Sequence, residues 1–210
     1  MKKILIAIPS DEHPDHEFVQ SLLALRPVGQ IEIKFQAGSL VYLSREILAA
    51  YAINNNFDYV LWLDDDMVFQ PDLLEKLIED DVDVAAGLFV QRRYPYEPAI
   101  WKDIVCGDEG RYDEKYLDYP ENSLFEIDAC GMAAVLVKGE VLKTVSETYH
   151  RTYEPISGYG EDISFCIRAK NSGYKLWCDS KVKVGHVGRY IFTDDTYKAV
   201  RAMRGLDKKE

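Results

Sequence analysis

The sequence predicts an α/β fold with a mostly parallel central sheet flanked by helices. In the first 88 residues, short apolar segments rich in β-branched residues alternate with segments of helical apolar spacing. Strands and helices that alternate in this way pair in parallel through right-handed crossovers. After residue 88 the alternation stops, and segments rich in Tyr, Pro and Gly follow. We therefore expect a Rossmann-like half followed by a smaller mixed or antiparallel part.

The first half contains four expected strands and three expected helices. The expected strands are residues 3–8, 31–35, 59–63 and 82–87. The expected helices are a segment around residues 18–25 and residues 42–54 and 73–78. Pro9 ends the first strand, and the turn 36–39 ends the second. The helix 42–54 is expected to place Ile47, Leu48, Tyr51 and Ala52 on its inner face.

The second half carries weaker periodic signals. Residues 89–125 are expected to form an irregular or antiparallel insertion. The later elements are expected strands at 126–129, 133–137, 174–178 and 183–187, and expected helices at 140–148, 161–170 and 194–204. The sequence contains no internal repeat and no convincing linker, so residues 1–210 are expected to form one domain.

Composition and charge narrow the possible functions. The net charge of -11 argues against nucleic acid bound by a basic face. The four cysteines show no CxxC spacing, so we expect reduced thiols and no zinc site. The first apolar run is too short for a signal peptide, and no segment approaches the roughly 20 apolar residues that span a bilayer. We therefore expect a cytoplasmic protein with no membrane span.

Three consecutive acids, Asp64, Asp65 and Asp66, directly follow the expected strand 59–63. They therefore lie at the carboxyl end of a central strand, where open α/β sheets bind their ligands. Neighbouring carboxylates raise one another's proton affinity, and a bound divalent cation relieves their repulsion. Taken alone, the run is explained equally well as an acidic turn that favours the positive N-terminus of the next helix.

A second pair of acids, Glu161 and Asp162, follows Gly160 and opens a helix. Acidic side chains are favoured at helix N-termini, so capping is the simpler explanation of the pair taken alone. If the same position faces a cleft, a carboxylate there can act as a general base towards a hydroxyl nucleophile.

His186 and Arg45 each allow two interpretations. His186 ends a late strand, where either backbone groups satisfy its imidazole or the imidazole completes a carboxylate site for Mn²⁺ or a similar ion. Arg45 lies in the first turn of the helix 42–54, where it either faces solvent or meets a phosphate.

The insertion 89–125 carries further residues with two interpretations. Arg92, Arg93 and Lys102 present the same choice as Arg45 between solvent and phosphate. The aromatic residues of the segment form either a platform for a sugar ring or the packing of the insertion itself. They are Tyr94, Tyr96 and Trp101.

In their order and spacing, these segments resemble the GT-A glycosyltransferases, especially the large inverting family 2 group. The matching segments are the first strand with its proline (5–9), Leu-Ser-Arg-Glu (43–46), Asp-Asp-Asp (64–66), Cys-Gly-Met-Ala (130–133) and Gly-Glu-Asp (160–162). The resemblance spans roughly residues 3–188. Its most specific part is the order of two motifs, DxD at residues 64–66 and ED at residues 161–162. Each motif stands in its expected local setting, at a strand end and at a helix start.

The resemblance implies a GT-A type fold with a nucleotide-sugar-binding half (1–88), an acceptor-binding and catalytic half (89–190) and a C-terminal tail (191–210). The implied reaction moves a sugar from a nucleotide-diphosphate sugar, with a UDP-sugar as first expectation, to a hydroxyl of a carbohydrate or another acceptor. Asp162 would be the general base of an inverting transfer, and Glu161 would orient the acceptor or cap the helix.

The resemblance also implies site residues. Asp64, Asp66 and His186 would hold Mn²⁺ or Mg²⁺. The implied nucleotide contacts are Pro9, Ser10, Gln36, Arg45, Asp64 and Asp65. The implied acceptor contacts are Trp101, Gly131 and Met132.

Two features depart from the family pattern. The turn that usually reads Asp-Asp-Gly-Ser and recognises the base is Gln-Ala-Gly-Ser at 36–39, which leaves the nucleobase open. The Gln-x-x-Arg-Trp element of processive synthases is absent from the sequence. Two alternatives are a non-catalytic nucleotide-sugar-binding module and a sugar-nucleotide nucleotidyltransferase, which usually carries a Gly-rich basic loop that residues 9–12 lack.

Overall fold

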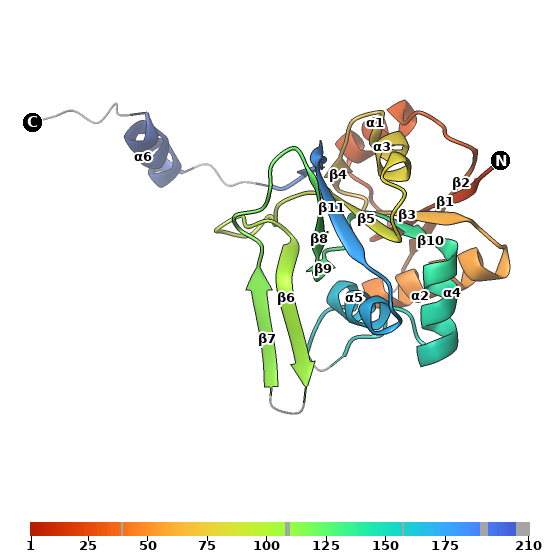
Figure 1. Cartoon of the computed structure of the whole chain (residues 1–210). Helices are drawn as coiled ribbons and strands as arrows, with labels where there is room; N and C mark the ends of the chain where they lie inside the picture. Colours follow the sequence, from red (N-terminus) through yellow and green to blue (C-terminus); the bar gives the residue numbers. More distant parts are fainter. Residues whose placement is uncertain (39, 108–109, 157, 190–192, 205–210) are drawn as a thin grey trace, which may run out of the picture.

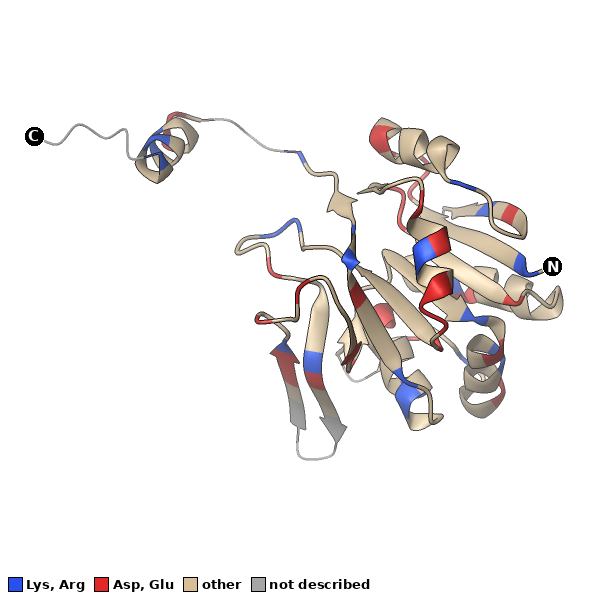
Figure 2. Ribbon diagram, turned by 45° about the horizontal axis from the view of Figure 1, so that its top comes forward, with Lys and Arg blue, Asp and Glu red and all other residues tan. Residues whose placement is uncertain are grey.

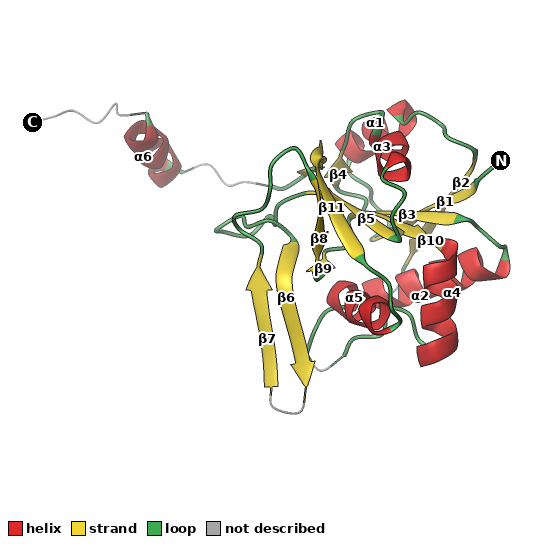
Figure 3. Cartoon of the chain, in the orientation of Figure 1, coloured by secondary structure: helices red, strands yellow, loops and turns green. Residues whose placement is uncertain are grey.

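The computed structural model describes residues 1–38, 40–107, 110–156, 158–189 and 193–204, without the side chains of residues 106–111. Helices cover both faces of a central sheet (Figures 1 and 3), which confirms the expected α/β class. Part of the expected turn at 36–39, part of the insertion and the last six residues of the tail lie outside the described residues.

The elements follow the expected order closely in the first half. The strands are β1 (Lys3–Ser10), β2 (Gln30–Ala37), β3 (Tyr59–Leu63), β4 (Met67–Val68), β5 (Val84–Leu88), β6 (Ile100–Gly107), β7 (Gly110–Lys115), β8 (Leu124–Ile127), β9 (Ala129–Cys130), β10 (Ala134–Lys138), β11 (Leu176–Lys183) and β12 (Gly185–His186). The helices are α1 (His16–Ala24), α2 (Val41–Asn54), α3 (Leu73–Glu79), α4 (Gly139–Tyr149), α5 (Glu161–Asn171) and α6 (Asp194–Met203).

Seven of the described strands form the central sheet in the order β2-β1-β3-β10-β5-β11-β8. Strands β2, β1, β3, β5 and β11 run in one direction, and β10 and β8 run against them. The sheet is therefore mixed with a mostly parallel core. Strand β10 separates β3 from β5, so the fourth strand of the alternating half does not pair with the third.

Helices cover both faces of the central strands, and successive side chains of a strand point to opposite faces. Leu61 and Leu63 of β3 pack with α1 and α3 on one face, whereas Val60 and Trp62 pack with α2, α4 and α5 on the other. All five residues of β3 are buried. The apolar run that precedes the three acids is therefore a central strand covered on both sides, and it holds the acids at its carboxyl end.

The position of β10 brings a late segment of the chain to these acids. Ala134 pairs with Leu63, and the amide of Asp64 donates a hydrogen bond to the carbonyl of Ala133 at 3.1 Å. The segment Gly131-Met132-Ala133 therefore lies directly beside the end of β3.

The last strands differ from the expectation of two strands at 174–178 and 183–187. Residues 176–183 form the single strand β11, with an irregularity between Asp179 and Lys183 where it pairs with β5. The chain then forms the short strand β12, which pairs antiparallel with β4. In this pairing His186 lies opposite Met67, and the amide of Val187 donates to the carbonyl of Asp66 at 2.8 Å.

Within the described residues, the insertion contains an antiparallel hairpin of β6 and β7, and β9 pairs with the base of β6. The hydroxyl of Tyr159 lies 3.2 Å from the carbonyl oxygens of both Val105 and Tyr112. These contacts tie the hairpin to the segment that leads into α5 (Figure 1).

The C-terminal helix and most of the charged side chains lie outside the buried core. None of the residues of α6 is buried, and Figure 1 shows this helix apart from the sheet. Lys and Arg are interspersed with Asp and Glu along the described elements (Figure 2). None of the described helices has the length and apolar composition needed to cross a membrane.

Candidate active site

Two adjoining hollows lie at the carboxyl end of β3, and both are lined by Asp64 and Arg92. The smaller one, of about 260 Å³, is lined also by Pro9, Ser10, Asp11, Val41, Ser44, Asp65 and Asp66. The larger one, of about 580 Å³, is lined also by Arg45, Phe89, Gln91, Arg93, Ala99, Trp101, Gly131, Met132, Ala133, Glu161, Asp162 and His186. The structure thus gathers nearly all of the expected site residues around one junction.

Asp66 and His186 face each other across the β4–β12 pairing. The Nε2 atom of His186 lies 3.4 Å from Oδ2 of Asp66, and both side chains are largely buried. Arg92 is also bound to this carboxylate, with Nη1 2.9 Å from the same Oδ2 atom. Burial disfavours the ionised form of Asp66, but the hydrogen bond to His186 and the charges of His186 and Arg92 outweigh it and lower the pKa of Asp66.

The chemistry of this pair fits a divalent cation. The Oδ1 atom of Asp66 is buried and has no hydrogen-bond partner among the described residues, so it is available as a ligand. The Nδ1 atom of His186 lies 3.1 Å from the carbonyl oxygen of Val90. With Nδ1 bonded to that carbonyl, release of the proton on Nε2 would leave the Nε2 lone pair facing Asp66, which is the usual arrangement of a metal-binding histidine. Within the described residues, no three His, Cys, Asp or Glu side chains form a complete cation site.

Arg45 lies inside the protein between two of the acids. Its side chain is 2% exposed, with Nη2 2.7 Å from Oδ1 of Asp64 and Nε 3.3 Å from Oε1 of Glu161. Burial alone would lower the pKa of Arg45, but the two carboxylates outweigh it and raise that pKa. Its guanidinium also lies 3.5 Å from the carbonyl oxygen of Met132. Arg45 therefore joins the end of β3 to the start of α5 and to the segment between β9 and β10.

The burial of Arg45 follows from the rotation of α2. The buried residues of this helix are Ser44, Arg45, Leu48, Ala49 and Ala52. Ile47, expected on the inner face, is 47% exposed. The inner face is thus shifted towards the positions of Arg45, Leu48 and Ala52, whose spacing of three and four residues is that of one helix face.

Asp162 lies in the first turn of α5, on the wall of the larger hollow. Its Oδ1 atom accepts a hydrogen bond from the amide of Ile163 at 2.7 Å. Burial and the charge of Glu161 raise the pKa of Asp162 to about 6, against smaller opposing effects of this hydrogen bond and of Arg45. A carboxylate with this pKa is ionised at neutral pH and is still basic enough to accept a proton.

Asp65 and Ser10 both line the smaller hollow and bind each other. The hydroxyl of Ser10 donates to Oδ2 of Asp65 at 2.6 Å, and the amide of Asp11 lies 3.3 Å from the same atom. The carbonyl of Asp65 accepts a hydrogen bond from the amide of Asp15 at 2.9 Å. Asp65 therefore anchors the loop between β1 and α1, a role that the sequence did not indicate.

The remaining expected contacts lie at different distances from the junction. Gly131 and Met132 line the larger hollow beside the end of β3, and so does Trp101 of β6. One face of the Trp101 ring is covered by Lys115, whose Nζ atom lies 3.6 Å from the ring centroid. Gln36 lines neither hollow, and its side-chain amide donates to the carbonyl of Ala37 at 3.2 Å. Its expected contact with the nucleotide stays a prediction.

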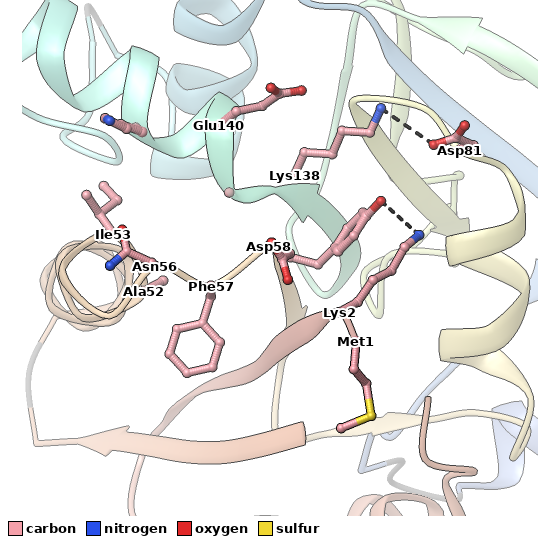
Figure 4. A pocket seen from close by; sticks show the side chains of 13 residues that line it. Met1, Lys2, Ala52, Ile53, Asn56, Phe57, Asp58, Asp81, Lys138 and Glu140 are labelled. Atoms are coloured by element: carbon pink, nitrogen blue, oxygen red, sulfur yellow. Dashed lines mark hydrogen bonds and ion pairs between the residues drawn. The ribbon is translucent and has the colours of Figure 1, made fainter. Parts of the chain in front are cut away.

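A third hollow, of about 760 Å³, lies at the opposite end of the sheet and contains none of these residues (Figure 4). It is formed by the start of β1, the end of α2 and the start of α4. Two of its cationic side chains have partners on its own walls: Lys2 donates to the hydroxyl of Tyr59 at 3.1 Å, and Lys138 lies 3.7 Å from Asp81. Open α/β sheets bind ligands at the carboxyl ends of their strands, so the junction at Asp64 is the candidate active site.

No protein-family profile and no curated protein sequence matches the chain. A solved structure of A197 from STIV is similar, with 14% sequence identity, a TM-score of 0.56 and coverage of 92% of this chain and 97% of A197. The crystal structure of GalNAc-T7 with UDP, GalNAc and Mn²⁺ is similar as well, with 12% identity and a TM-score of 0.61. That match covers 90% of this chain and 44% of the GalNAc-T7 chain. At these identities the likeness concerns the fold alone, and it shows that the chain has a GT-A-like fold.

Proposed function

We propose that this chain is a metal-dependent glycosyltransferase that moves a sugar from a nucleotide-diphosphate sugar to an acceptor hydroxyl with inversion. The observation that carries the proposal is the division of the acids between two hollows that meet at Asp64 and Arg92. In an inverting displacement the nucleophile attacks the anomeric carbon from the side opposite the leaving group. The reaction therefore needs a base on one side and a site for an anionic leaving group on the other.

The smaller hollow is the proposed donor side. Pro9, Ser10 and Asp65 would contact the nucleotide. Asp66 would hold Mn²⁺ or Mg²⁺ together with His186, which approaches it from the wall of the larger hollow, with Asp64 as a further ligand or a ribose contact. A divalent ion held there supplies positive charge that stabilises the leaving diphosphate. The crystal structure of GalNAc-T7 holds UDP, GalNAc and Mn²⁺, which supports a UDP-sugar as the first donor to test.

The larger hollow is the proposed acceptor side, where Trp101, Gly131 and Met132 would contact the acceptor. Asp162 would take the proton of the attacking hydroxyl as the new glycosidic bond forms. Two observations support this role: Asp162 lines the hollow, and its pKa is raised to about 6. Glu161, fixed by Arg45, would orient the acceptor.

The proposal is tested first by thermal-shift measurements with UDP, GDP, ADP and CDP, each with and without Mn²⁺. Ligand binding raises the melting temperature only for nucleotides that bind the folded chain. We expect a Mn²⁺-dependent rise for one of them, followed by hydrolysis or transfer of the matching nucleotide sugar. Loss of the metal ligand in Asp66→Asn should abolish the Mn²⁺-dependent rise.

The matched control is Asp118→Asn, which removes the same charge at an exposed position outside both hollows. It should behave like the unchanged protein. If EDTA leaves nucleotide binding and turnover untouched, the metal assignment fails. Pyrophosphate-dependent formation of a sugar nucleotide would favour a nucleotidyltransferase, and binding without turnover would favour a non-catalytic module.

A further inference from the structure

Arg92 lies where the two hollows meet and has no role in the proposed reaction as the DxD and ED motifs define it. Its Nη1 atom lies 2.9 Å from Oδ2 of Asp66 and 3.0 Å from the carbonyl oxygen of Val187. Its side chain lines both hollows and is 51% exposed, whereas that of Asp66 is 15% exposed. A half-exposed guanidinium is thus bound to a largely buried carboxylate where the two hollows meet.

We propose that Arg92 is a diphosphate-binding residue that competes with the divalent cation for Asp66 and turns to the donor when the donor and cation bind together. This inference rests on the proposed function and adds to it a role for a side chain outside the DxD and ED motifs. The ligand it recognises is the diphosphate of a nucleoside diphosphate or nucleotide sugar.

The competition follows from the geometry of one oxygen atom. Oδ2 of Asp66 is shared by Arg92 at 2.9 Å and His186 at 3.4 Å. A divalent cation held between Asp66 and His186 would lie close to the guanidinium, and like charges at such short range repel. Arg92 should therefore weaken the binding of the cation when no anion accompanies it.

A bound diphosphate reverses the effect of Arg92 on the affinity for the cation. It carries negative charge to the cation, and the planar guanidinium can donate two parallel hydrogen bonds to phosphate oxygens. Because the Arg92 side chain is half exposed and comes from the segment between β5 and β6, it can leave Asp66 without opening the buried core. The same side chain then opposes the bare cation and favours the cation–diphosphate pair.

A purely structural ion pair would behave differently. If Arg92 served only to hold Asp66 and the carbonyl of Val187 in place, its removal would loosen the site. The affinities for the cation and for the nucleotide would then fall together. The two roles are therefore distinguished by the sign of the change in cation affinity.

The test is isothermal titration calorimetry on the full chain with two probes, Mn²⁺ alone and UDP in the presence of saturating Mn²⁺. If the thermal-shift panel identifies another nucleoside diphosphate, that one replaces UDP. In Arg92→Ala we expect Mn²⁺ alone to bind about 5-fold tighter and the nucleotide to bind roughly 10–100-fold weaker, as for a lost hydrogen bond to a charged group. Arg92→Lys keeps the positive charge but loses the planar guanidinium that donates two parallel hydrogen bonds. Its Mn²⁺ affinity should therefore stay near that of the unchanged protein, while its nucleotide affinity should be only partly kept.

The matched control is Arg93→Ala, which removes the same charge from the next residue. Arg93 also lines the larger hollow but makes no described contact with Asp66. It should leave the Mn²⁺ affinity unchanged. Equal or parallel losses of both affinities in Arg92→Ala, or no change in either, would overturn the inference while leaving the proposed function intact. If the unchanged protein binds neither Mn²⁺ nor any of the four nucleoside diphosphates, both proposals fail.

Discussion

Asp66 and Asp162 are carboxylates of the same cleft, but their surroundings act on them in opposite directions. Asp66 lies between His186 and Arg92, and these two groups lower its pKa despite its burial. Asp162 is also withdrawn from water, but its acidic neighbour Glu161 adds to the effect of burial and its pKa rises to about 6. The sign of the neighbouring charge, and not burial alone, therefore distinguishes the two sites.

Titratable groups whose environments push their pKa values apart are suited to different roles in one reaction. A carboxylate that stays ionised can bind a cation in place of the groups that neutralise it. A carboxylate whose pKa lies near neutrality is suited to accept a proton. Arg45 lies between the two regions and binds Asp64 of one and Glu161 of the other. The following predictions test this contrast, beginning with the largest effect.

The first prediction concerns the base. Asp162→Asn should lower the kcat of sugar transfer by ~10²–10⁴-fold, because the hydroxyl nucleophile loses its proton acceptor. The affinities of Asp162→Asn for the nucleotide and for Mn²⁺ should stay within about 2-fold of those of the unchanged protein. A change on the acceptor side is thereby distinguished from a change on the donor side. The control is Glu140→Gln, another acidic residue in the first turn of a helix, which is exposed on α4. Near-normal transfer by a folded Asp162→Asn protein would remove Asp162 from the base role.

The second prediction concerns the link between the two regions. Arg45→Met should cost about 3–5 kcal/mol of the free energy of unfolding, because it leaves the largely buried Glu161 and the partly buried Asp64 without their buried cation. Urea unfolding followed by circular dichroism measures this change. Lys76→Met, which breaks the surface pair with Asp72, is the control and should cost about 0–1 kcal/mol. If Arg45→Met loses no more stability than Lys76→Met, Arg45 does not couple the region of Asp64 to that of Glu161.

The third prediction uses the pKa of Asp162, about 6 in the folded protein against an ordinary value of 3.8. The folded state holds this proton more tightly than the unfolded state, so ionised Asp162 destabilises the fold above pH 6. Asp162→Asn should therefore raise the free energy of unfolding at pH 7 by up to about 3 kcal/mol, and the gain should fade between pH 6 and pH 4. A pH series of urea unfolding curves measures it, and a gain that persists at pH 3.5 would point to a cause other than titration.

The same titration should appear in the reaction rate. Because the base must be ionised, kcat/KM of the unchanged protein should fall as the pH drops below about 6. The residual rate of Asp162→Asn should lack this step. A step of equal size in both proteins would assign it to another group.

The smallest expected effect concerns the loop between β1 and α1. Ser10→Ala and Asp65→Asn each remove part of the hydrogen bond between these side chains, and each should cost about 1 kcal/mol of stability. The double variant should cost less than the sum of the two, because both changes act on one contact. Full additivity in urea unfolding would mean that the two residues act independently.

Much of the fold could be predicted from the sequence, because apolar periodicity reports which segments are buried strands and helices. The alternating first half, the acids at the end of β3 and the acidic start of α5 are all properties of local sequence. The candidate site residues are predicted from these local properties, since carboxylates at the carboxyl end of a central strand lie where α/β sheets bind ligands.

The tertiary structure alone decided which segments lie together. Nothing in the apolar pattern of β10 says that it enters between β3 and β5, because a buried strand pairs equally well with any apolar neighbour. The two-residue strands β4 and β12 are too short to carry a periodic signal, yet their pairing places His186 beside Asp66. The partners of Arg45 lie 19 and 116 residues along the chain, so its burial depends on contacts that local propensity does not encode.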